Sequence, residues 1–246
     1  METRQVSVVA PCFNEESNVE VLVERLASVF KDNNLNGEVV LVDDASTDNT
    51  RSMIQGLQSK YHNVRLVAHD ENKGIAGAWQ SGIDAAKGEY VCFIDADLQN
   101  LPEDVARLYQ EIVTKKVGLV QGWRKPVLAD GNSVMRGVVS RGLNFFLNTL
   151  FGMHLTDNKS GFVMAKKDVL AHVIQHRGRY TYFQTFIAVS AKKKGYSISE
   201  VETVFAKRNA GQSYIQGKIL KAMFLTVIDL VKGIWEFGLF ARPRKS

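Results

Sequence analysis

The sequence predicts an α/β fold in which a mostly parallel sheet is covered by helices. Short apolar runs of strand length alternate with segments of helical periodicity through the first half of the 246 residues. The runs are apolar at successive positions, which is typical of parallel strands buried on both faces. The composition, with 45% hydrophobic and 23% charged residues, is that of a globular protein with a sizeable core.

The first half contains five expected strands joined by helices with right-handed crossovers. The strands are expected at Val6–Ala10, Glu38–Val42, Val64–Ala68, Tyr90–Ile94 and Gly118–Gln121. The helices are expected from a capping box at Ser17-Asn18-Val19-Glu20 to about Phe30, from about Asp48 to Tyr61, from about Gly74 to Ala86, and from near Pro102 onward.

The alternation stops after Arg124. The second half is expected to contain a loop at Lys125–Asn132, a long helix at Ser133–Leu150, strands at Ser160–Lys166 and Ser197–Val204 around a helix near Tyr182–Lys194, a loop at Lys207–Tyr214 and a final helix at Lys218–Leu239. We divide the chain into a main domain, residues 1–212, and a C-terminal segment, residues 213–246, made of an amphipathic helix and a basic tail.

Polar segments follow each strand of the first half. They are Pro11–Glu15, Asp43-Asp44, His69–Gly74, Asp95–Gln99 and Gly122–Arg124. Because ligands of open α/β sheets bind at the carboxyl ends of the strands, we expect these segments to gather around one site.

The segment Asp95-Ala96-Asp97-Leu98-Gln99 follows the buried run Tyr90–Ile94. Two carboxylates one residue apart, with an amide oxygen two residues further on, suit a hard divalent cation that also holds phosphate oxygens. The alternative is a solvated loop with two acidic residues.

The other strand ends favour binding of a nucleotide, although the sequence has neither a dinucleotide-binding motif nor a P-loop motif. Asp43 and Asp44 are placed to accept hydrogen bonds from a nucleoside, although the turn through Asp48 also suits helix capping. Lys73 lies at a helix start that favours phosphate, or it belongs to a simple turn. The sequence contains neither Gly-x-Gly-x-x-Gly after the first strand nor a Walker Gly-Lys-Ser/Thr.

Four ordered motifs of the first half resemble those of family 2 glycosyltransferases. They are Pro11-Cys12-Phe13-Asn14-Glu15, Val42–Asp48, Asn72-Lys73-Gly74 and Asp95–Gln99. The branch that the chain resembles most is that of the dolichyl- or polyprenyl-phosphate hexosyltransferases.

This resemblance implies a GT-A fold, with residues 1–212 as the catalytic domain, and a nucleotide-sugar donor of the GDP-mannose or UDP-glucose type. It implies that Asp95, Asp97 and Gln99 hold Mg²⁺ or Mn²⁺. The donor site is then expected to contain Pro11, Phe13, Glu15, Asp43, Asp44 and Lys73.

The second half matches positions that handle phosphates in this branch, and arginine suits phosphate oxygens. These are Arg124, Arg136, Ser140 and Arg208, which join Asp95 and Asp97 as the expected catalytic residues. Asp157–Phe162 resembles the Asp-x-x-Ser-Gly-Phe element of the branch, and Arg208–Ser213 its Arg-x-x-Gly-x-Ser element. Trp123 and Tyr214 depart from the pattern, which leaves the acceptor open.

A lipid phosphate is anionic near neutral pH and attacks without a general base, whereas a sugar hydroxyl needs one. We therefore expect an inverting transfer of a hexose to a polyprenyl or dolichyl phosphate. The first alternative is a soluble family 2 enzyme that acts on a glycan hydroxyl, for which Asp157 is the candidate base. The second alternative is a non-catalytic nucleotide- or membrane-binding module.

The final helix has a broad apolar face with Trp235 and Phe237 and a basic flank, a pattern typical of a helix at a membrane interface. The alternatives are that this face packs on the core, on a second copy of the chain or on a membrane partner protein. The sequence predicts no spanning segment, no signal peptide, buried free thiols at Cys12 and Cys92, and no nucleic-acid partner. We therefore expect a cytoplasmic protein, peripheral at the cytoplasmic face of a membrane.

Overall fold

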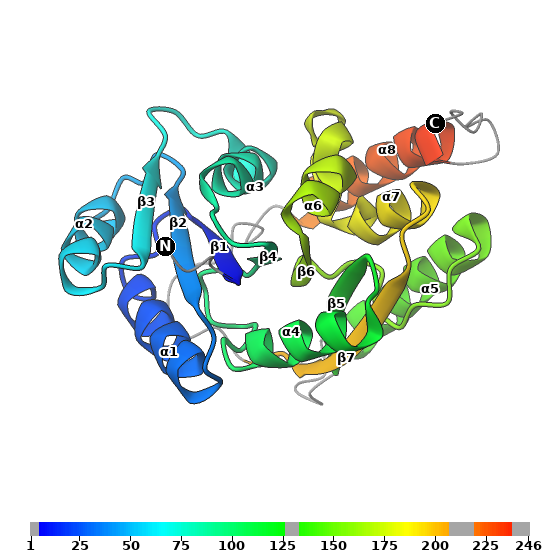
Figure 1. Ribbon diagram of the computed structural model, residues 1–246. Coiled ribbons are helices and arrows are strands. Elements are labelled where there is room, and N and C mark those ends of the chain that lie inside the picture. The colour runs from blue at the N-terminus through cyan, green and yellow to red at the C-terminus, as the bar shows by residue number, and fades with distance from the viewer. Residues whose placement is uncertain (1–4, 126–132, 207–218, 238–246) are drawn as a thin grey trace.

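The computed structural model describes residues 5–125, 133–206 and 219–237 (Figure 1). Its strands are β1 (Val6–Cys12), β2 (Gly37–Asp43), β3 (Val64–Ala68), β4 (Tyr90–Phe93), β5 (Leu119–Lys125), β6 (Val163–Lys166) and β7 (Ile198–Val204). Its helices are α1 (Val19–Asp32), α2 (Thr50–Lys60), α3 (Gly74–Ala85), α4 (Asp104–Lys115), α5 (Ser133–Phe151), α6 (Lys167–Val173), α7 (Ile187–Lys193) and α8 (Ile219–Phe237), with 3-10 helices η1 (Ile174–Arg179) and η2 (Phe183–Phe186).

The strands form one mixed sheet in the order β3-β2-β1-β4-β6-β5-β7. The first four are parallel, as the sequence predicts. The fifth does not pair with β4, because β6 lies between them and is antiparallel to both. The mostly parallel sheet is therefore confirmed, and its single reversal brings the loop that precedes β6 to the same edge as the loops after β4 and β5.

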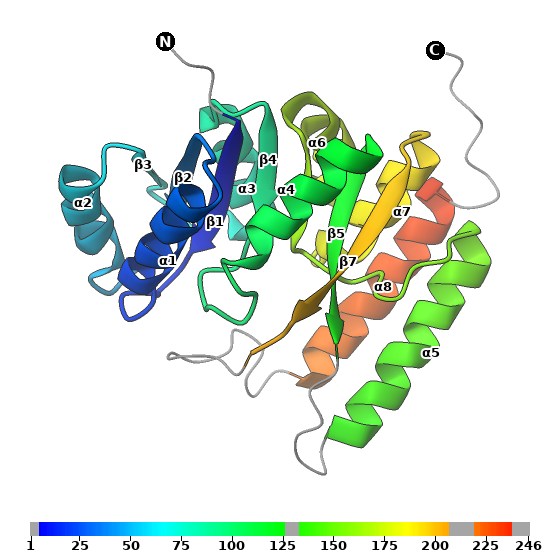
Figure 2. The same ribbon diagram turned by 60° about the horizontal axis from the view of Figure 1, so that its bottom comes forward.

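Each face of the sheet is covered by helices (Figures 1 and 2). Alternate residues of β1 point to opposite faces, so Val8 lies in the core with α1, α2 and α4, and Val9 lies in the core with α3, α6 and α7. Both residues are fully buried. This double burial explains why the strands read as continuous apolar runs.

Some local expectations need correction. Helix α1 begins at Val19 with Asn18 as its N-cap, and Asn18 donates to Glu15, so the capping box expected at Ser17 is not formed. The segment expected as a helix near Tyr182–Lys194 is divided into η2 and α7, and α6 with η1 had no expected counterpart. Cys12 and Cys92 are buried free thiols, as expected, and burial raises the pKa of each.

The final helix packs with part of its polar side inward. Asp229 is 1% exposed, and its Oδ2 accepts hydrogen bonds from the backbone N–H groups of Thr181 (2.9 Å) and Tyr182 (2.8 Å). Phe237 is also buried, whereas Trp235 is 69% exposed. Phe237 therefore shows the packing on the core that the sequence leaves open for the apolar face, and Trp235 does not. Lys218, where the final helix is expected to begin, lies outside the described residues.

Among the described residues, no helix is both long and apolar enough to cross a membrane.

Candidate active site

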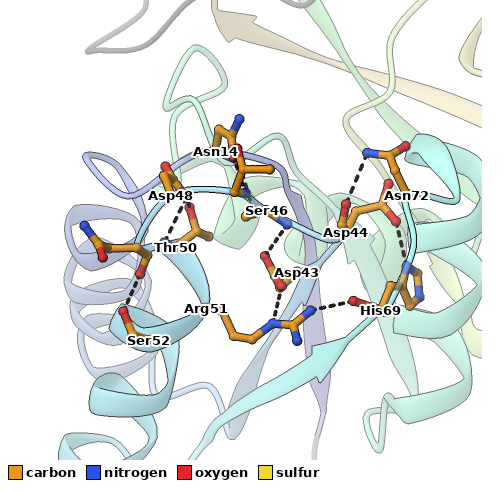
Figure 3. A network of polar contacts seen from close by, with 12 residues as sticks. Asn14, Asp43, Asp44, Ser46, Asp48, Thr50, Arg51, Ser52, His69 and Asn72 are labelled. Atoms are coloured by element: carbon orange, nitrogen blue, oxygen red, sulfur yellow. Dashed lines mark hydrogen bonds and ion pairs between the residues drawn. The ribbon is translucent and has the colours of Figure 1, made fainter.

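Polar contacts join the loops that follow β1 and β2 (Figure 3). The backbone N–H of Asn14 donates to Ser46 Oγ at 3.0 Å, and that of Thr47 donates to Asn14 Oδ1 at 2.8 Å. Asn14 and Ala45 both adopt left-handed backbone conformations, with φ of 57° and 61°. Non-glycine residues in this conformation are uncommon, so two in facing loops indicate backbones fixed by their surroundings.

Asp43 and Asp44 end β2 and point in different directions from it. Asp43 is fully buried, with Oδ2 2.6 Å from Arg51 Nε and Oδ1 3.3 Å from the N–H of Ser46. The capping role open for Ser46 is not observed, because α2 begins at Thr50, whose N–H and hydroxyl both contact Asp48 Oδ1. Those hydrogen bonds outweigh partial burial and lower the pKa of Asp48.

Asp44 joins β2 to the loop after β3. Its Oδ1 lies 2.6 Å from His69 Nδ1 and accepts the backbone N–H of Lys73 at 2.9 Å, while its carbonyl oxygen accepts Asn72 Nδ2 at 3.1 Å (Figure 3). Asp44 is only 4% exposed. These contacts show Asp44 fixing the start of α3, where the Lys73 side chain is exposed.

The remaining residues expected in the donor site lie on or directly after β1. Pro11 is within the strand, Phe13 is 39% exposed, and Glu15 Oε2 accepts Asn18 Nδ2 at 2.6 Å. The structure therefore gathers the predicted segments after β1, β2 and β3 into one network. Their contacts with a nucleotide stay predictions.

The loop after β4 presents the predicted metal ligands. Leu98 has a φ of 62°, which turns the chain so that the N–H of Gln99 donates to Asp97 Oδ1 at 3.0 Å. Asp97 is 6% exposed, and Asn100 Nδ2 donates to Asp95 Oδ2 at 3.3 Å. The Gln99 side-chain amide donates to Ala206 O at 3.4 Å.

This donor set fits a divalent cation that shares its coordination with phosphate. Asp95 and Asp97 supply hard carboxylate oxygens from one short turn, and Mg²⁺ in such sites is bound through one or two carboxylates plus substrate phosphates. Among the described residues, no group of three or more His, Cys, Asp or Glu side chains is placed to hold a metal.

A pocket lies beside Asp95, on the side of the antiparallel strand. Its described lining comes from α3, the loop after β4, the end of β5, the loop before β6, η2 and the residue after β7: Ile75, Trp79, Asp95, Asn100, Arg124, Lys159, Ser160, Gly161, Gln184 and Phe205. Only two of these, Asp95 and Arg124, are in the predicted catalytic set. The pocket thus confirms that the ends of β4 and β5 converge, as the sequence predicts.

Arg124 is held in the pocket by two contacts. Its Nε lies 2.7 Å from Asp157 Oδ2, and its guanidinium lies 5.3 Å from the ring centroid of Phe205. Burial favours the neutral form of Asp157, but the hydrogen bond and charge of Arg124 outweigh it and hold the pKa of that carboxyl below its ordinary value. Burial also lowers the pKa of Lys159, against the attraction of Asp157, and Arg124 lowers it further.

The structure brings some predicted acceptor residues to this region and leaves others undescribed. Arg136, Ser140 and Arg208 lie outside the described side chains. Asn144, on the same face of α5 as Arg136 and Ser140, donates to Leu155 O at 2.8 Å and accepts the N–H of Asn158 at 2.8 Å, so it supports the loop before Asp157.

Sequence reasoning missed several residues of the two regions. Arg51 and Gln184 lie in none of the motifs quoted above, and tertiary packing brings them to the strand ends. Lys159 lies within the Asp157–Phe162 element but was given no role. Asn100 was the most accessible to prediction, because it directly follows Gln99.

The fold is the GT-A fold found in glycosyltransferases. Glucosyl-3-phosphoglycerate synthase from Mycobacterium tuberculosis superposes with a TM-score of 0.67 at 18% identity, over 92% of this chain and 79% of that one. A mannosyltransferase from Pyrobaculum calidifontis, solved with GDP-mannose and Mn²⁺, gives a TM-score of 0.65 at 20% identity, over 94% of this chain and 65% of that one. At these identities the likeness shows the fold alone.

The chain belongs to glycosyl transferase family 2, whose sequence profile matches residues 7–174. It is 28% identical to dodecaprenyl-phosphate galacturonate synthase of Rhizobium johnstonii, over 99% of this chain and 70% of that protein. It is 29% identical to dolichol-phosphate mannosyltransferase of Mycosarcoma maydis, over 96% of this chain and 81% of that protein. The protein is therefore a family 2 glycosyltransferase with relatives named for transfer of sugars to polyprenyl phosphates.

Proposed function

We propose that this protein is a metal-dependent, inverting glycosyltransferase that moves a hexose from a nucleotide sugar to a polyprenyl or dolichyl phosphate. The names of two relatives, which specify dodecaprenyl phosphate and dolichol phosphate, support this acceptor class. The observation that carries the proposal is the ion pair of Arg124 with Asp157 beside Asp95.

That ion pair bears on the choice between acceptors. A sugar hydroxyl requires a general base, and the candidate for that role is Asp157. Arg124 holds the pKa of Asp157 below its ordinary value, which makes this carboxylate a weaker base. Asp157 contacts Arg124 from outside the described lining of the pocket, and the carboxylate within that lining is Asp95, which the proposal assigns to the metal. An acceptor phosphate that is already anionic needs neither Asp157 nor Asp95 as a general base.

The chain's own residues then have distinct tasks. Asp95 and Asp97, with Gln99 close by, hold the cation that, when bound, neutralises charge on the departing nucleoside diphosphate. The loops after β1, β2 and β3 hold the nucleoside, and Arg124 attracts the phosphate of the acceptor. Attack in line with the departing diphosphate inverts the anomeric carbon.

We place the reaction at the cytoplasmic face of a membrane, with the protein bound peripherally. Val227, Val231 and Trp235 lie four residues apart on α8 and are 56%, 52% and 69% exposed, so they form an apolar stripe on its outer side. Lys232 is also exposed on this helix and suits anionic lipid headgroups. Buried free thiols at Cys12 and Cys92 agree with a reducing compartment.

The test is transfer of labelled sugar from UDP-glucose or GDP-mannose to a polyprenyl phosphate in the presence of Mn²⁺, with the lipid product extracted and identified by mass. Asp97→Asn should reduce turnover roughly 100- to 1,000-fold, as expected for loss of a group that stabilises developing charge. Asp84→Asn, an exposed aspartate on α3, is the matched control and should retain wild-type turnover.

Undiminished transfer by the wild-type protein in a chelator would contradict the metal assignment. Transfer to a glycan hydroxyl, with none to the lipid phosphate, would favour the second acceptor class.

A further inference from the structure

Two side-chain oxygens of the pocket are buried without a hydrogen-bond donor in the described part of the chain. They are Asn100 Oδ1 and Gln184 Oε1. Asn100 as a whole is 4% exposed, and its amide nitrogen is used by Asp95. Of the buried side-chain atoms without a hydrogen-bond partner among the described residues, these two line the pocket, and a ligand with hydroxyl donors would satisfy both.

Gln184 is held rigidly in this position. It lies on η2 between Phe183 and Phe186, which are both fully buried. The preceding residues Thr181 and Tyr182 are tied to α8 through Asp229. The backbone that carries Gln184 is therefore fixed by the core, which favours a residue that discriminates between ligands.

The rest of the pocket suits a small polyhydroxylated group next to a phosphate. Arg124 and Lys159 provide positive charge, and Asp95 connects the pocket to the proposed metal site. Gly161 leaves space between Trp79 and Gln184, because a Cβ built at Gly161 would lie 3.5 Å from Trp79 Cζ2 and 3.8 Å from Gln184 Cβ. Any larger side chain at this position would enter that space.

We propose that Gln184 is a specificity-determining residue of the donor site, where its side-chain oxygen accepts a hydrogen bond from a hydroxyl of the transferred hexose. This assignment rests on the proposed function. A pyranose ring beside Asp95 brings hydroxyl donors to both buried oxygens, and Asn100 is the second acceptor. Gln184 is the residue to test, because Asn100 also contacts Asp95 and its replacement would disturb the metal site.

The experiment compares the affinity for a nucleotide sugar with that for its parent nucleotide. UDP, UDP-glucose, GDP and GDP-mannose are titrated with Mn²⁺ into the wild type, Gln184→Met, Gln184→Glu and the control Gln175→Met. Met keeps the length of Gln without the acceptor, Glu keeps the acceptor, and Gln175 is an exposed residue on η1.

Gln184→Met should lose roughly tenfold in affinity for the preferred nucleotide sugar, the effect of one hydrogen bond, with affinity for the parent nucleotide unchanged. Gln184→Glu and Gln175→Met should keep the wild-type ratio. Equal loss for nucleotide and nucleotide sugar, or no loss, would overturn the role of Gln184 alone. If Gln184→Met does not fold, the test rests on Gln184→Glu. A folded Gln184→Glu that loses the wild-type ratio of nucleotide-sugar affinity to nucleotide affinity would overturn the role of Gln184. A wild type that binds none of the four compounds would overturn the proposed function as well.

Discussion

At the scale of single residues, the acidic side chains at the strand ends divide into two kinds. Asp43 and Asp44 are buried and engaged by Arg51, His69 and the backbone of neighbouring loops. Asp95 borders the pocket, and Asp97 is held by the turn that it belongs to. The structure therefore shows Asp43 and Asp44 fixing loops, whereas Asp95 borders a pocket.

Asp157 provides a prediction of stability against pH. Its pKa is lowered in the folded protein, so its contribution is fully present above the unfolded value of about 3.9 and is lost as the pH falls through the folded value. Replacement by Asn should therefore destabilise the protein by about 1–2 kcal/mol at pH 7, between the values typical of exposed and buried pairs. Urea unfolding at a series of pH values measures this difference.

The difference in the free energy of unfolding between the wild type and Asp157→Asn should become smaller below about pH 4, because protonation of Asp157 removes its ion pair with Arg124. Asp84→Asn, on the exposed side of α3, serves as the control and should show no such dependence. A difference that stays constant down to pH 3 would show that the charge of Asp157 is not its source.

At the scale of elements, α3 is the part that links the nucleotide-side loops to the pocket. Its start is fixed by Asp44, and Ile75 and Trp79, in its first and second turns, line the pocket. Trp79 stacks on Phe93 of β4, with ring centroids 4.8 Å apart. The position of α3 on the sheet therefore determines the geometry of both regions.

The contact of α3 with β1 depends on Gly82. A Cβ built there would lie 2.2 Å from Val9 Cγ1, which is closer than atoms can approach. Gly82→Ala should destabilise the protein by about 1–3 kcal/mol through overpacking. Gly56→Ala, on exposed α2 with open space around it, should instead stabilise it by about 0.5–1 kcal/mol. Chemical denaturation of both variants provides the comparison, and stabilisation by both would contradict the close packing of α3.

At the scale of the whole molecule, α8 connects the active-site region to the outer surface. Asp229 binds the backbone that leads to Gln184, and Gly233 lies so close to Phe186 that a Cβ there would be 2.2 Å from its ring. The opposite side of the helix exposes Val227, Val231 and Trp235. The exposed stripe and the segment that carries Gln184 therefore lie on opposite sides of α8.

This arrangement predicts that the exposed apolar stripe of α8 binds a membrane surface. The double variant Val231→Ser, Trp235→Ser should sediment with vesicles of phosphatidylglycerol and phosphatidylcholine roughly tenfold less than the wild type, because it removes apolar area from the exposed stripe. Val113→Ser, an exposed apolar residue on α4, is the control and should bind as the wild type does. If the wild type does not sediment but dimerises through this stripe, the membrane assignment is wrong.

The alternation of strands and helices can be predicted from the sequence alone, because burial on both faces leaves continuous apolar runs. The polar strand ends can be predicted in the same way, because ligands of such sheets bind where the strands end. The ordered motifs of the sequence also indicated the family, which the profile match over residues 7–174 confirms. Tertiary structure alone decided that β6 lies antiparallel between β4 and β5, and it alone brought Arg51, Lys159 and Gln184 to the strand ends. Strand order and long-range side-chain partners depend on which surfaces pack together, and the local periodicity of the sequence does not predict that packing.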